Sequence, residues 1–439
     1  MKIVYVPSVP ISVVKTNHYV VMTCVLDLHI HSKYSRACSA RLELPEIEKT
    51  CRQKGIDIIA TGDFTHPRWF EHLQANLEPL GDSGFYKLKN SDGRIKFILG
   101  TEISSIYKRD GKTRRVHTCF YLPSLESVAR LNDRLRQAGY NLNADGRPII
   151  GLDVRDLAEI FYQIDERMQI IPAHIWTPWF AMLGSKSGFD SVEECWGEWA
   201  DKIAALETGL SSDPAMNWRC SFLDKYSLVS NSDAHSTQNL GREANVFAET
   251  PKTYDELFQI LKTKDKNKFL YTLEFYPEEG MYHFDGHRDC GVVFSPDESR
   301  HHSDICPKCL RPLTLGVARR VADLADRPEG FVLESAPTYH SLVELDKVIA
   351  AALGVKSRSS KKVKIYYDQL LKSGKNELDL LLWEQRDNLE KWSTPSIAEG
   401  IERVRRGQVK LSAGYDGEYG RVEIFGEEEN GKGKQAKLI

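Results

Sequence analysis

The hydrophobic positions of this chain form short runs that alternate with helical patterns between residues 24 and 250. A short apolar run bounded by polar turns predicts a buried strand, whereas apolar positions three and four apart predict an amphipathic helix. Strands are expected at residues 25–26, 56–60, 95–99, 116–121, 169–174, 204–207 and 226–229, and a helix at 44–54. This alternation predicts an α/β domain in which crossover helices join parallel strands, as a barrel or a doubly wound sheet.

The pattern changes after residue 250. An amphipathic helix is expected over residues 251–268, then a polar, turn-rich stretch, then a helix over 313–326. Further helices are expected at 342–353, 366–371, 378–385 and 397–405, and a hairpin from 409–411 and 421–425. We therefore predict units spanning residues 22–250, 251–330 and 331–425. The charged residues 426–439 are expected to be disordered, and residues 1–21 can be read as an extension upstream of Met22.

Composition excludes several classes of protein. Of the 439 residues, 41% are hydrophobic and 28% are charged, which is ordinary for a globular protein. The net charge of −3 gives no overall basic field, so a nucleic-acid partner would have to be held by local patches. No apolar run reaches the roughly 18 residues that a membrane span needs, and no signal-peptide pattern is present, so a cytoplasmic protein without membrane contact is expected.

The nine cysteines divide into two kinds. Six are scattered in apolar or helical contexts and are interpreted as buried thiols of a reducing compartment. The other three belong to two spaced pairs, His287 with Cys290 and Cys306 with Cys309, separated by a polar stretch. This spacing predicts a closed structural zinc site of the Cys₃His type. Three nearby histidines are alternatives for the fourth ligand: His283, His301 and His302.

Two short motifs about 200 residues apart place potential metal ligands at alternate positions after apolar runs: Asp27-Leu28-His29-Ile30-His31 and Ser232-Asp233-Ala234-His235. Because side chains at i and i+2 of a strand point to the same face, each motif presents its ligands from one face of a strand end. Asp27 is expected to support a neighbouring ligand rather than to bind metal itself.

Other ligand-type residues also follow predicted strands, and the carboxyl ends of parallel strands meet at one rim. The predicted metal set is His29, His31, Asp63, His66, Glu102, His117, His174, Asp233 and His235. Such a set would hold two or three divalent ions, and imidazole with carboxylate suits zinc or manganese better than magnesium, although all three are candidates.

Divalent ions in such a set would activate water for phosphoester hydrolysis. The residues expected to act in catalysis are Asp233, Glu102 and His31. Either Asp63 or Glu102 is expected to bridge two ions. Asp233 is expected either to bind metal or to orient the water.

The order of these motifs resembles the PHP (polymerase and histidinol phosphatase) superfamily of metal-dependent phosphoesterases. The resemblance implies a distorted (β/α)7 barrel, here with a small zinc-binding module and a mainly helical C-terminal region. It also implies the metal set named above except His66, where the chain departs from the superfamily's pattern. The superfamily usually has Asp and His adjacent after the second strand, whereas this chain reads Asp63-Phe64-Thr65-His66.

Within that superfamily the chain is similar to the endonuclease Q family from about residue 24 to 425. The similarity lies in Asp27–Ser32, Pro172–Trp179, Glu207–Pro214, the later Cys-x-x-Cys pair and Gly414–Gly420. It implies an endonuclease of DNA repair that nicks the phosphodiester 5′ to deaminated bases (hypoxanthine, uracil, xanthine) and to abasic sites.

Residues expected to contact DNA follow two strand ends or lie in basic runs. A flipped base would stack on aromatic side chains and accept or donate hydrogen bonds. The candidates are Trp176, Trp179, Ser211, Ser212, Asn217, Trp218 and Arg219, with packing of the rim loops as the alternative. Candidates for phosphate contact are Lys361, Lys362, Arg405 and Arg406, with a solvated surface as the alternative.

Two other functions remain open from the sequence. One is a PHP-type phosphatase of a small phosphomonoester, and the other is a DNA-binding accessory protein without activity. Damaged DNA is the expected partner, which would place the protein on the nucleoid when it is bound. A repair or replication-clamp partner is a further possibility.

Overall fold

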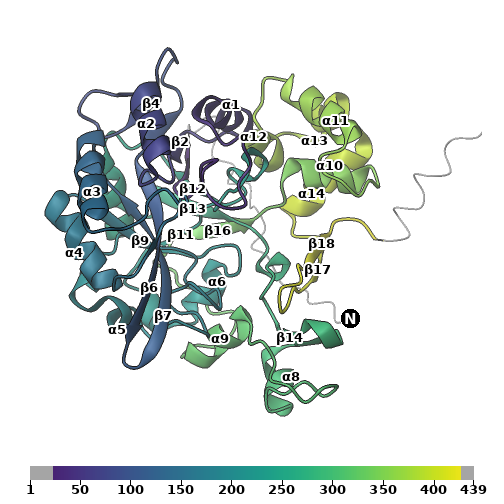
Figure 1. The fold of residues 1–439 in the computed structure, drawn as a ribbon. Helices are drawn as coiled ribbons and strands as arrows, with labels where there is room; N and C mark the ends of the chain where they lie inside the picture. The colour runs from purple at the N-terminus through teal and green to yellow at the C-terminus, as the bar shows by residue number, and fades with distance from the viewer. Residues whose placement is uncertain (1–22, 427–439) are drawn as a thin grey trace, which may run out of the picture.

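In the computed structural model, which describes residues 23–426, an eight-stranded mixed sheet lies at the centre of the α/β domain (Figure 1). Its strand order is β16-β13-β12-β1-β2-β5-β4-β3. The bounds are β1 Cys24–Asp27, β2 Ile58–Ala60, β3 Leu77–Pro79, β4 Tyr86–Leu88, β5 Lys96–Ile98, β12 Ala244–Phe247, β13 Phe269–Glu274 and β16 Thr338–Ser341. β1, β2 and β5 run parallel, and β1 and β2 are buried throughout, as expected for apolar strands covered on both faces.

Two smaller sheets complete the domain. Their strands are β6 Gly100–Arg109, β7 Lys112–Tyr121, β8 Ile149–Ile150, β9 Gln169–Pro172, β10 Leu206–Glu207 and β11 Leu228–Val229. β6 and β7 form a long antiparallel hairpin whose turn, Asp110-Gly111, has φ angles of 53° and 72°. The predicted strand at 116–121 is the second half of β7, which follows β6 through a hairpin and not a crossover helix, because only two residues separate β7 from β6.

The predicted α/β class is confirmed, but a closed seven-stranded barrel is not. Within residues 23–426 the strands belong to separate sheets, which isolated bridges such as Ile30–Ala234 and Ile170–Ile203 connect. Several strands at the junctions, β8, β10 and β11, have only two residues each, too few to form a continuous ladder.

Helices cover these sheets. They are α1 Leu44–Lys54, α2 Pro67–Asn76, α3 Leu125–Gln137, α4 Val154–Ile164, α5 Val192–Trp196, α6 Pro214–Trp218 and α7 Tyr254–Thr263, with the 3-10 turns η1 Gly197–Lys202, η2 Ser221–Leu223 and η3 Thr237–Asn239. The predicted helix 44–54 is confirmed as α1. Side chains of Ser124, Asp153 and Thr253 cap α3, α4 and α7 by accepting backbone N–H groups of the first turn.

The domain continues past the predicted boundary at residue 250. β13 pairs antiparallel with β12, and β16 pairs parallel with β13, so residues 269–274 and 338–341 belong to the central sheet. The helix predicted over 251–268 is shorter for the same reason: α7 ends at Thr263, and the apolar run that begins at Phe269 becomes a strand.

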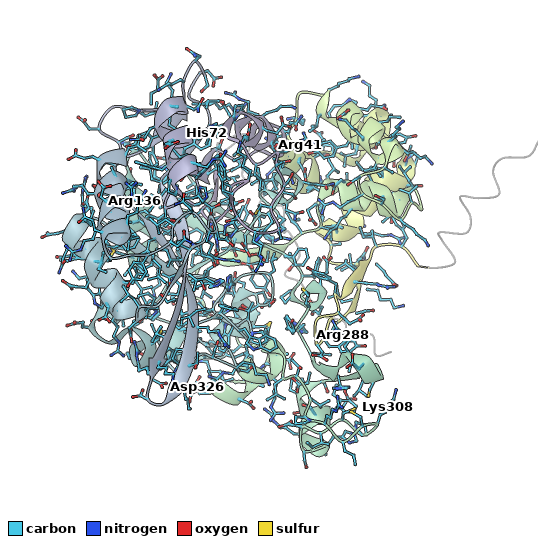
Figure 2. All side chains as sticks on the ribbon, viewed as in Figure 1. Arg41, His72, Arg136, Arg288, Lys308 and Asp326 are labelled. Carbon is cyan, nitrogen blue, oxygen red and sulfur yellow. The ribbon has the colours of Figure 1, made fainter. Side chains whose placement is uncertain are left out.

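A small lobe lies between β13 and α9, and we call residues 285–315 the knuckle lobe. The elements of this region are η4 Pro277–Glu279, β14 Asp285–His287, η5 Arg288–Cys290, β15 Val292–Phe294, α8 Pro296–His301 and α9 Val317–Leu324. The buried apolar cluster of the lobe consists of Val292, Cys306 and Leu313. Figure 2 shows Arg288 and Lys308 on this lobe, at the end of the molecule opposite α11.

The C-terminal region is helical, as predicted. It contains α10 Leu345–Ala352, α11 Lys361–Leu371, α12 Glu377–Leu382, α13 Arg386–Trp392, α14 Pro395–Arg405 and the hairpin β17 Lys410–Ser412 with β18 Arg421–Glu423. Its apolar core also takes in Val25, Val246 and Leu273 of the central sheet, so the two parts share one interior. The predicted tail at 426–439 and the extension at 1–21 lie outside the described residues, apart from Gly426. Among the described helices none is long and apolar enough to cross a membrane.

Candidate metal centre

The two sequence motifs lie side by side at the rim of the α/β domain. Ile30 follows β1 and forms an isolated bridge with Ala234, and the His31 N–H donates to the Ala234 carbonyl at 3.1 Å. This pairing brings the alternate positions on either side, His29 and His31 from one motif and Asp233 and His235 from the other, to a single place.

Four of the predicted ligands form a first group: His29, His31, Glu102 and Asp233. The His31 Nε2 lies 3.1 Å from Asp233 Oδ1 and 3.3 Å from Glu102 Oε2, and the His29 Nε2 lies 3.6 Å from the same Glu102 oxygen. Three of these facing atoms, His29 Nε2, His31 Nε2 and Asp233 Oδ1, are buried without a hydrogen-bond partner in the described protein. Buried polar atoms are nearly always satisfied, so this convergence fits a cation held between them.

A second group consists of Glu102, His117 and His174. The Glu102 Oε1 lies 2.7 Å from His117 Nδ1 and 3.2 Å from His174 Nε2. Glu102 therefore directs one carboxylate oxygen at each group. The geometry favours Glu102 over Asp63 as a residue that could bridge two ions.

Asp63 lies behind His31 rather than among the ligands. Its Oδ1 accepts from the His31 Nδ1–H at 2.9 Å, and its Oδ2 accepts from the Ser32 N–H at 2.6 Å and from the hydroxyls of Ser32 and Ser35. With both oxygens occupied, Asp63 fixes the orientation and tautomer of His31. The sequence predicted Asp63 as a metal ligand, and in the described residues it belongs to neither group of candidate ligand atoms.

Two further predicted ligands also stand apart from the two groups. The His66 ring stacks on Tyr34 at 4.5 Å between centroids, so the added residues between Asp63 and His66 carry it away from the ligand atoms. The His235 ring packs against His31 at 4.6 Å, and its Nδ1 lies 2.9 Å from the Asp233 carbonyl oxygen. His235 is thus at the rim, next to the first group.

Glu207, at the end of β10, was not predicted as a site residue. Its carboxylate accepts from the His29 Nδ1–H at 3.0 Å, from the Asn231 side chain at 2.8 Å and from the His174 N–H at 2.8 Å. Glu207 thus fixes the orientation and tautomer of His29, as Asp63 does for His31. Its position directly after an apolar strand was the signal that could have identified it. Gly209 permits the close packing here, because a Cβ at its φ of 65° would lie 2.4 Å from the His174 Cβ.

Arg147 is a second functional candidate that the sequence did not reveal. Its guanidinium donates to Glu102 Oε2 at 2.9 Å, and 24% of its side chain is exposed. It comes from a loop with no strand end and no motif, so no sequence pattern indicates it.

The charges of the site favour ionised carboxylates. Burial opposes ionisation of Glu102, but the charge of Arg147 together with the adjacent His117 and His29 holds the pKa of that carboxyl well below its usual range. Burial lowers the pKa of the His117 imidazole to about 4 even though Glu102 is adjacent. For His29 and His31 the neighbouring charges prevail over burial and raise the pKa well above its usual range. The carboxylates thus have the charge that metal ligands need, and His29 and His31 would release a proton on binding metal.

Asp27 supports the loop that carries Asp233, in line with its expected place. Its carboxylate accepts from the Ser232 N–H at 3.0 Å and from the Gly241 N–H at 2.9 Å. Burial raises the pKa of Asp27 to about 6.

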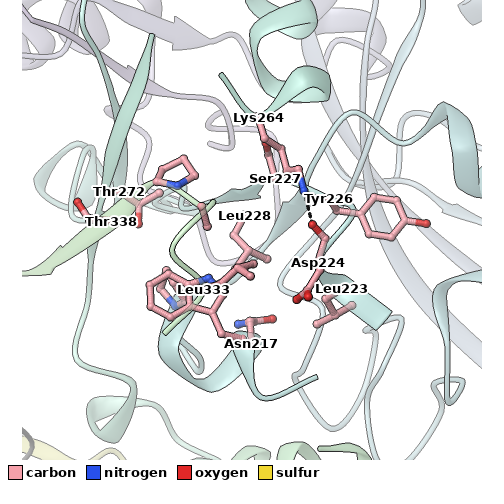
Figure 3. Close-up of a pocket in the computed structure, with 14 residues that line it drawn as sticks. Asn217, Leu223, Asp224, Tyr226, Ser227, Leu228, Lys264, Thr272, Leu333 and Thr338 are labelled. Carbon is pink, nitrogen blue, oxygen red and sulfur yellow. Dashed lines mark hydrogen bonds between the residues drawn. The ribbon is translucent and has the colours of Figure 1, made fainter. Parts of the chain in front are cut away.

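Most residues predicted to read a base are instead part of the interior. Trp176 is fully buried and donates its indole N–H to the Asn217 side chain at 2.7 Å, while the Asn217 amide donates to Ser212 at 3.1 Å. Figure 3 shows Asn217 lining a narrow pocket with Leu223 and Leu333, and Trp218 also lines it. For Trp176, Asn217 and Ser212 the structure shows the packing alternative, because their polar atoms bond to one another.

The other predicted DNA contacts divide by exposure. Trp179 is half-buried against Tyr282, Ser211 is buried and Arg219 is half-buried. Arg405 is mostly buried and donates to the carbonyls of Leu380 and Leu381, so it closes the end of α12 rather than facing solvent. Exposed side chains remain at three of the predicted positions: Lys361, Lys362 and Arg406.

The predicted zinc residues also converge. One ligand atom from each of His287, Cys290, Cys306 and Cys309 lies within 4.8 Å of the others. The alternative ligands lie elsewhere: His283 is buried, His301 Nδ1 contacts the Asp297 carbonyl oxygen, and His302 stacks on Phe294. The four residues therefore have the composition and proximity of a Cys₃His zinc site.

An α/β domain with a buried centre of imidazoles and carboxylates is the architecture of a metal-dependent hydrolase. The fold and sequence resemble the crystal structure of the lesion-specific endonuclease PfuEndoQ from Pyrococcus furiosus, with a TM-score of 0.80 and 30% identity over 95% of this chain and 98% of that chain. The chain belongs to the endonuclease Q family, which confirms the resemblance seen in the sequence.

Other comparisons agree in extent. A crystal structure of endonuclease Q with a 27-mer duplex carrying an abasic lesion matches with a TM-score of 0.80 and 30% identity over 93% of this chain and 98% of that chain. The uncharacterised protein YqxK of Bacillus subtilis is 27% identical over 90% of this chain and 98% of its own length.

The uncharacterised protein MJ0043 of Methanocaldococcus jannaschii is 31% identical over 56% of this chain, and the match spans only 31% of that relative. The model of the MJ0043 C-terminal domain family matches residues 344–408, which cover α10 to α14.

Proposed function

We propose that this chain is a metal-dependent DNA endonuclease that nicks the phosphodiester 5′ to deaminated bases and abasic sites. The observation that carries the proposal is the centre itself: three buried, unpartnered ligand atoms face one another in a fold that matches an endonuclease Q bound to duplex with an abasic lesion. Multi-ion hydrolysis and lesion-specific cleavage are the finer parts of this proposal.

The two groups would each hold one divalent ion, with Glu102 between them. Ions bound there would lower the pKa of a coordinated water and neutralise the phosphate oxygens during displacement. Zinc or manganese fits this mixed imidazole and carboxylate set. A third ion near His235 would be compatible with its place beside His31.

The chain's own residues would orient the reacting groups. Asp233 has one oxygen aimed at His31, and 23% of its side chain is exposed, which makes it the ligand best placed to accept a proton from an attacking water. Arg147 presents a fixed positive charge beside Glu102 that would stabilise the negative charge of the reacting phosphate. Glu207 and Asp63 keep His29 and His31 in place throughout.

The test is cleavage of a 5′-labelled duplex carrying one uracil, hypoxanthine or abasic site, next to the undamaged duplex, with manganese or zinc. The lesion strand should shorten to a product that ends at the 5′ side of the lesion. Equal cleavage of both duplexes would contradict lesion recognition. Turnover of a phosphomonoester without any DNA cleavage would favour the small-molecule phosphatase instead.

A further inference from the structure

A polar cavity of about 570 Å³ lies between the β6–β7 hairpin and the loop at residues 184–190. We call this cavity the basic pocket, because five cationic side chains line it: Lys112, Arg114, Arg115, Lys186 and Arg320. We propose that the basic pocket binds a backbone phosphate of the cleaved DNA strand, about one nucleotide from the bond that is cut. This inference rests on the proposed function.

The pocket adjoins the metal centre through β7. Arg115 precedes the candidate ligand His117 by two positions, so both side chains lie on one face of the strand, about 7 Å apart along it. The Phe180 ring packs against His117 at 4.8 Å, and the Arg115 guanidinium lies 5.9 Å from the same ring. The Phe180 ring therefore lies between a candidate ligand of the second group and a cation that lines the cavity.

The wall of the pocket is held by its own backbone. The His117 N–H donates to the Phe180 carbonyl at 3.0 Å, the Lys186 N–H to Pro178 at 2.9 Å, and the Gly188 N–H to Gly184 at 2.9 Å. A Cβ at Gly188 would lie 2.4 Å from the Gly184 nitrogen, so the turn closes more tightly than any larger residue would allow. Such a fixed loop presents Lys186 without a large ordering cost.

The charges of the pocket are unbalanced. Two carboxylates, Asp190 and Glu194, face the five cations, and Arg320 is the partner of Asp190. Among the described residues, neither the Arg115 nor the Lys186 side chain has an ion-pair or hydrogen-bond partner. Free cations over a rigid polar floor would attract an anion rather than a neutral base.

Arg114 forms that floor. Its side chain is 6% exposed, its guanidinium stacks on Phe189 at 3.9 Å, and it pairs with Glu194 at 3.5 Å and donates to the Gly188 carbonyl. These contacts hold Arg114 in place beneath the free cations Arg115 and Lys186. A phosphate oxygen is an acceptor of the charge that these two cations require.

The chemistry of the pocket suits a phosphodiester and not a lesion. Contacts to phosphate fix the position of a nucleic acid and carry no sequence information. A phosphate held here would set the register of the strand, so that the neighbouring phosphodiester lies over the metal groups. A free phosphate or nucleotide carries the same chemistry, and the experiment must distinguish that source from DNA.

The experiment removes positive charges from the protein and single negative charges from the DNA, and asks whether the two changes affect binding independently. Wild type and the double variant Arg115→Ala/Lys186→Ala are compared on lesion duplexes in which one phosphate at a time, three on each side of the lesion, is a neutral methylphosphonate. Binding is measured in an Asp233→Asn background so that no strand is cut. At one position the neutral linkage should weaken the binding of wild type about tenfold. At the same position it should leave the affinity of the double variant unchanged.

The salt dependence gives an independent readout. Loss of one phosphate contact should reduce the slope of log Kd against log salt by about 1 in the double variant. A matched control, Arg134→Ala/Lys89→Ala, removes two exposed cations outside the pocket and should leave both the slope and the methylphosphonate profile unchanged. Circular dichroism confirms that all variants are folded.

The outcomes separate the two proposals. If the methylphosphonate costs both proteins equally at every position, the pocket does not hold a DNA phosphate. If inorganic phosphate binds wild type and not the double variant, while no DNA position is coupled, the pocket takes a free anion and the inference is overturned. If wild type cuts no lesion duplex at all, the proposed function itself fails.

Discussion

The metal centre of the α/β domain and the candidate zinc site of the knuckle lobe are built in different ways. In the metal centre His29, His31 and Asp233 follow strands of a large core, Glu102 and His117 lie within β6 and β7, and His29 and His31 are almost fully buried. Asp63 and Glu207, which belong to neither group of candidate ligands, hold those two rings from behind. The knuckle lobe has a buried apolar cluster of only three residues, and its candidate ligand Cys309 is exposed.

The two sites differ in what holds their candidate ligands in position. In the α/β domain, packing and hydrogen bonds place the ligands before any ion binds, so the fold should persist without metal. A lobe with so little apolar area has little hydrophobic stabilisation of its own, so zinc bound at its four candidate ligands would supply part of its folding free energy. We therefore expect metal loss to abolish chemistry in the first site and structure in the second.

The largest effect should come from Asp233→Asn. The amide keeps the shape of the side chain but removes the charge and the proton-accepting oxygen at the centre of the first group. Cleavage of a uracil duplex should fall by at least about 10³-fold, while melting temperature and duplex binding change little. Single-turnover kinetics and calorimetry measure these quantities.

Asp82→Asn is the matched control, because Asp82 is exposed and distant from both clusters in the sequence. It should cleave at the wild-type rate. If Asp233→Asn instead lowers the melting temperature strongly with activity partly retained, the centre is not organised by the fold as argued above.

The next effect is on the knuckle lobe. Cys306→Ala removes a buried thiol that is both a candidate zinc ligand and one of the three residues of the lobe's apolar cluster. Metal analysis should show the loss of about one zinc, and amides at residues 285–315 should lose protection from hydrogen exchange, while those of β1 and β2 remain protected. Protection of the lobe after zinc loss would show that it folds without the ion.

The sequence predicted the parts of this fold that depend on local pattern. The apolar run at 56–60 became β2, the amphipathic run at 44–54 became α1, and the helices after residue 342 are present. Ligands at strand ends were also predictable, because strand alternation alone places His29 and His31 on one face. The spacing of His287, Cys290, Cys306 and Cys309 was equally local.

What the sequence could not predict depends on contacts between distant segments. Asp63 and Glu102 are both carboxylates after strands, and only the fold shows that one faces His31 Nδ1 while the other faces two ligand groups. Arg147 reaches Glu102 from a loop without any pattern. Trp176 and Asn217 were candidates for base contact, but in the interior they form a hydrogen bond with each other.

A smaller effect tests the support behind the centre. Glu207→Gln keeps a hydrogen-bonding side chain next to His29 but removes the negative charge that strengthens the imidazole as a ligand. The affinity of the centre for manganese should fall about 10- to 100-fold. Titration of activity with metal measures this change, and zinc bound to the knuckle is an internal control that should stay constant. Equal loss from both sites would mean that the substitution disturbs the whole chain.

The smallest expected effect lies one layer further from the ligands. The Glu274 carboxylate accepts from the hydroxyls of Thr208 and Ser230 at 3.2 and 3.0 Å, and Thr208 adjoins Glu207. Burial raises the pKa of Glu274 to about 8. The folded protein thus keeps a proton up to about pH 8 that the unfolded chain releases near the ordinary glutamic acid pKa of about 4.3. The free energy of unfolding must therefore fall as pH rises through this window.

Glu274→Gln cannot ionise, so it should reduce that fall; the part that remains belongs to Glu243, whose pKa is raised by burial and by the neighbouring Glu274. At pH 5 the variant and wild type should unfold at nearly the same temperature, and at pH 9 the variant should be more stable by about 1–3 kcal/mol. Thermal unfolding at each pH measures the difference, with Glu71→Gln on the exposed face of α2 as the control. A stability gain that is the same at both pH values would contradict this prediction. It would show that ionisation of Glu274 does not lower the free energy of unfolding.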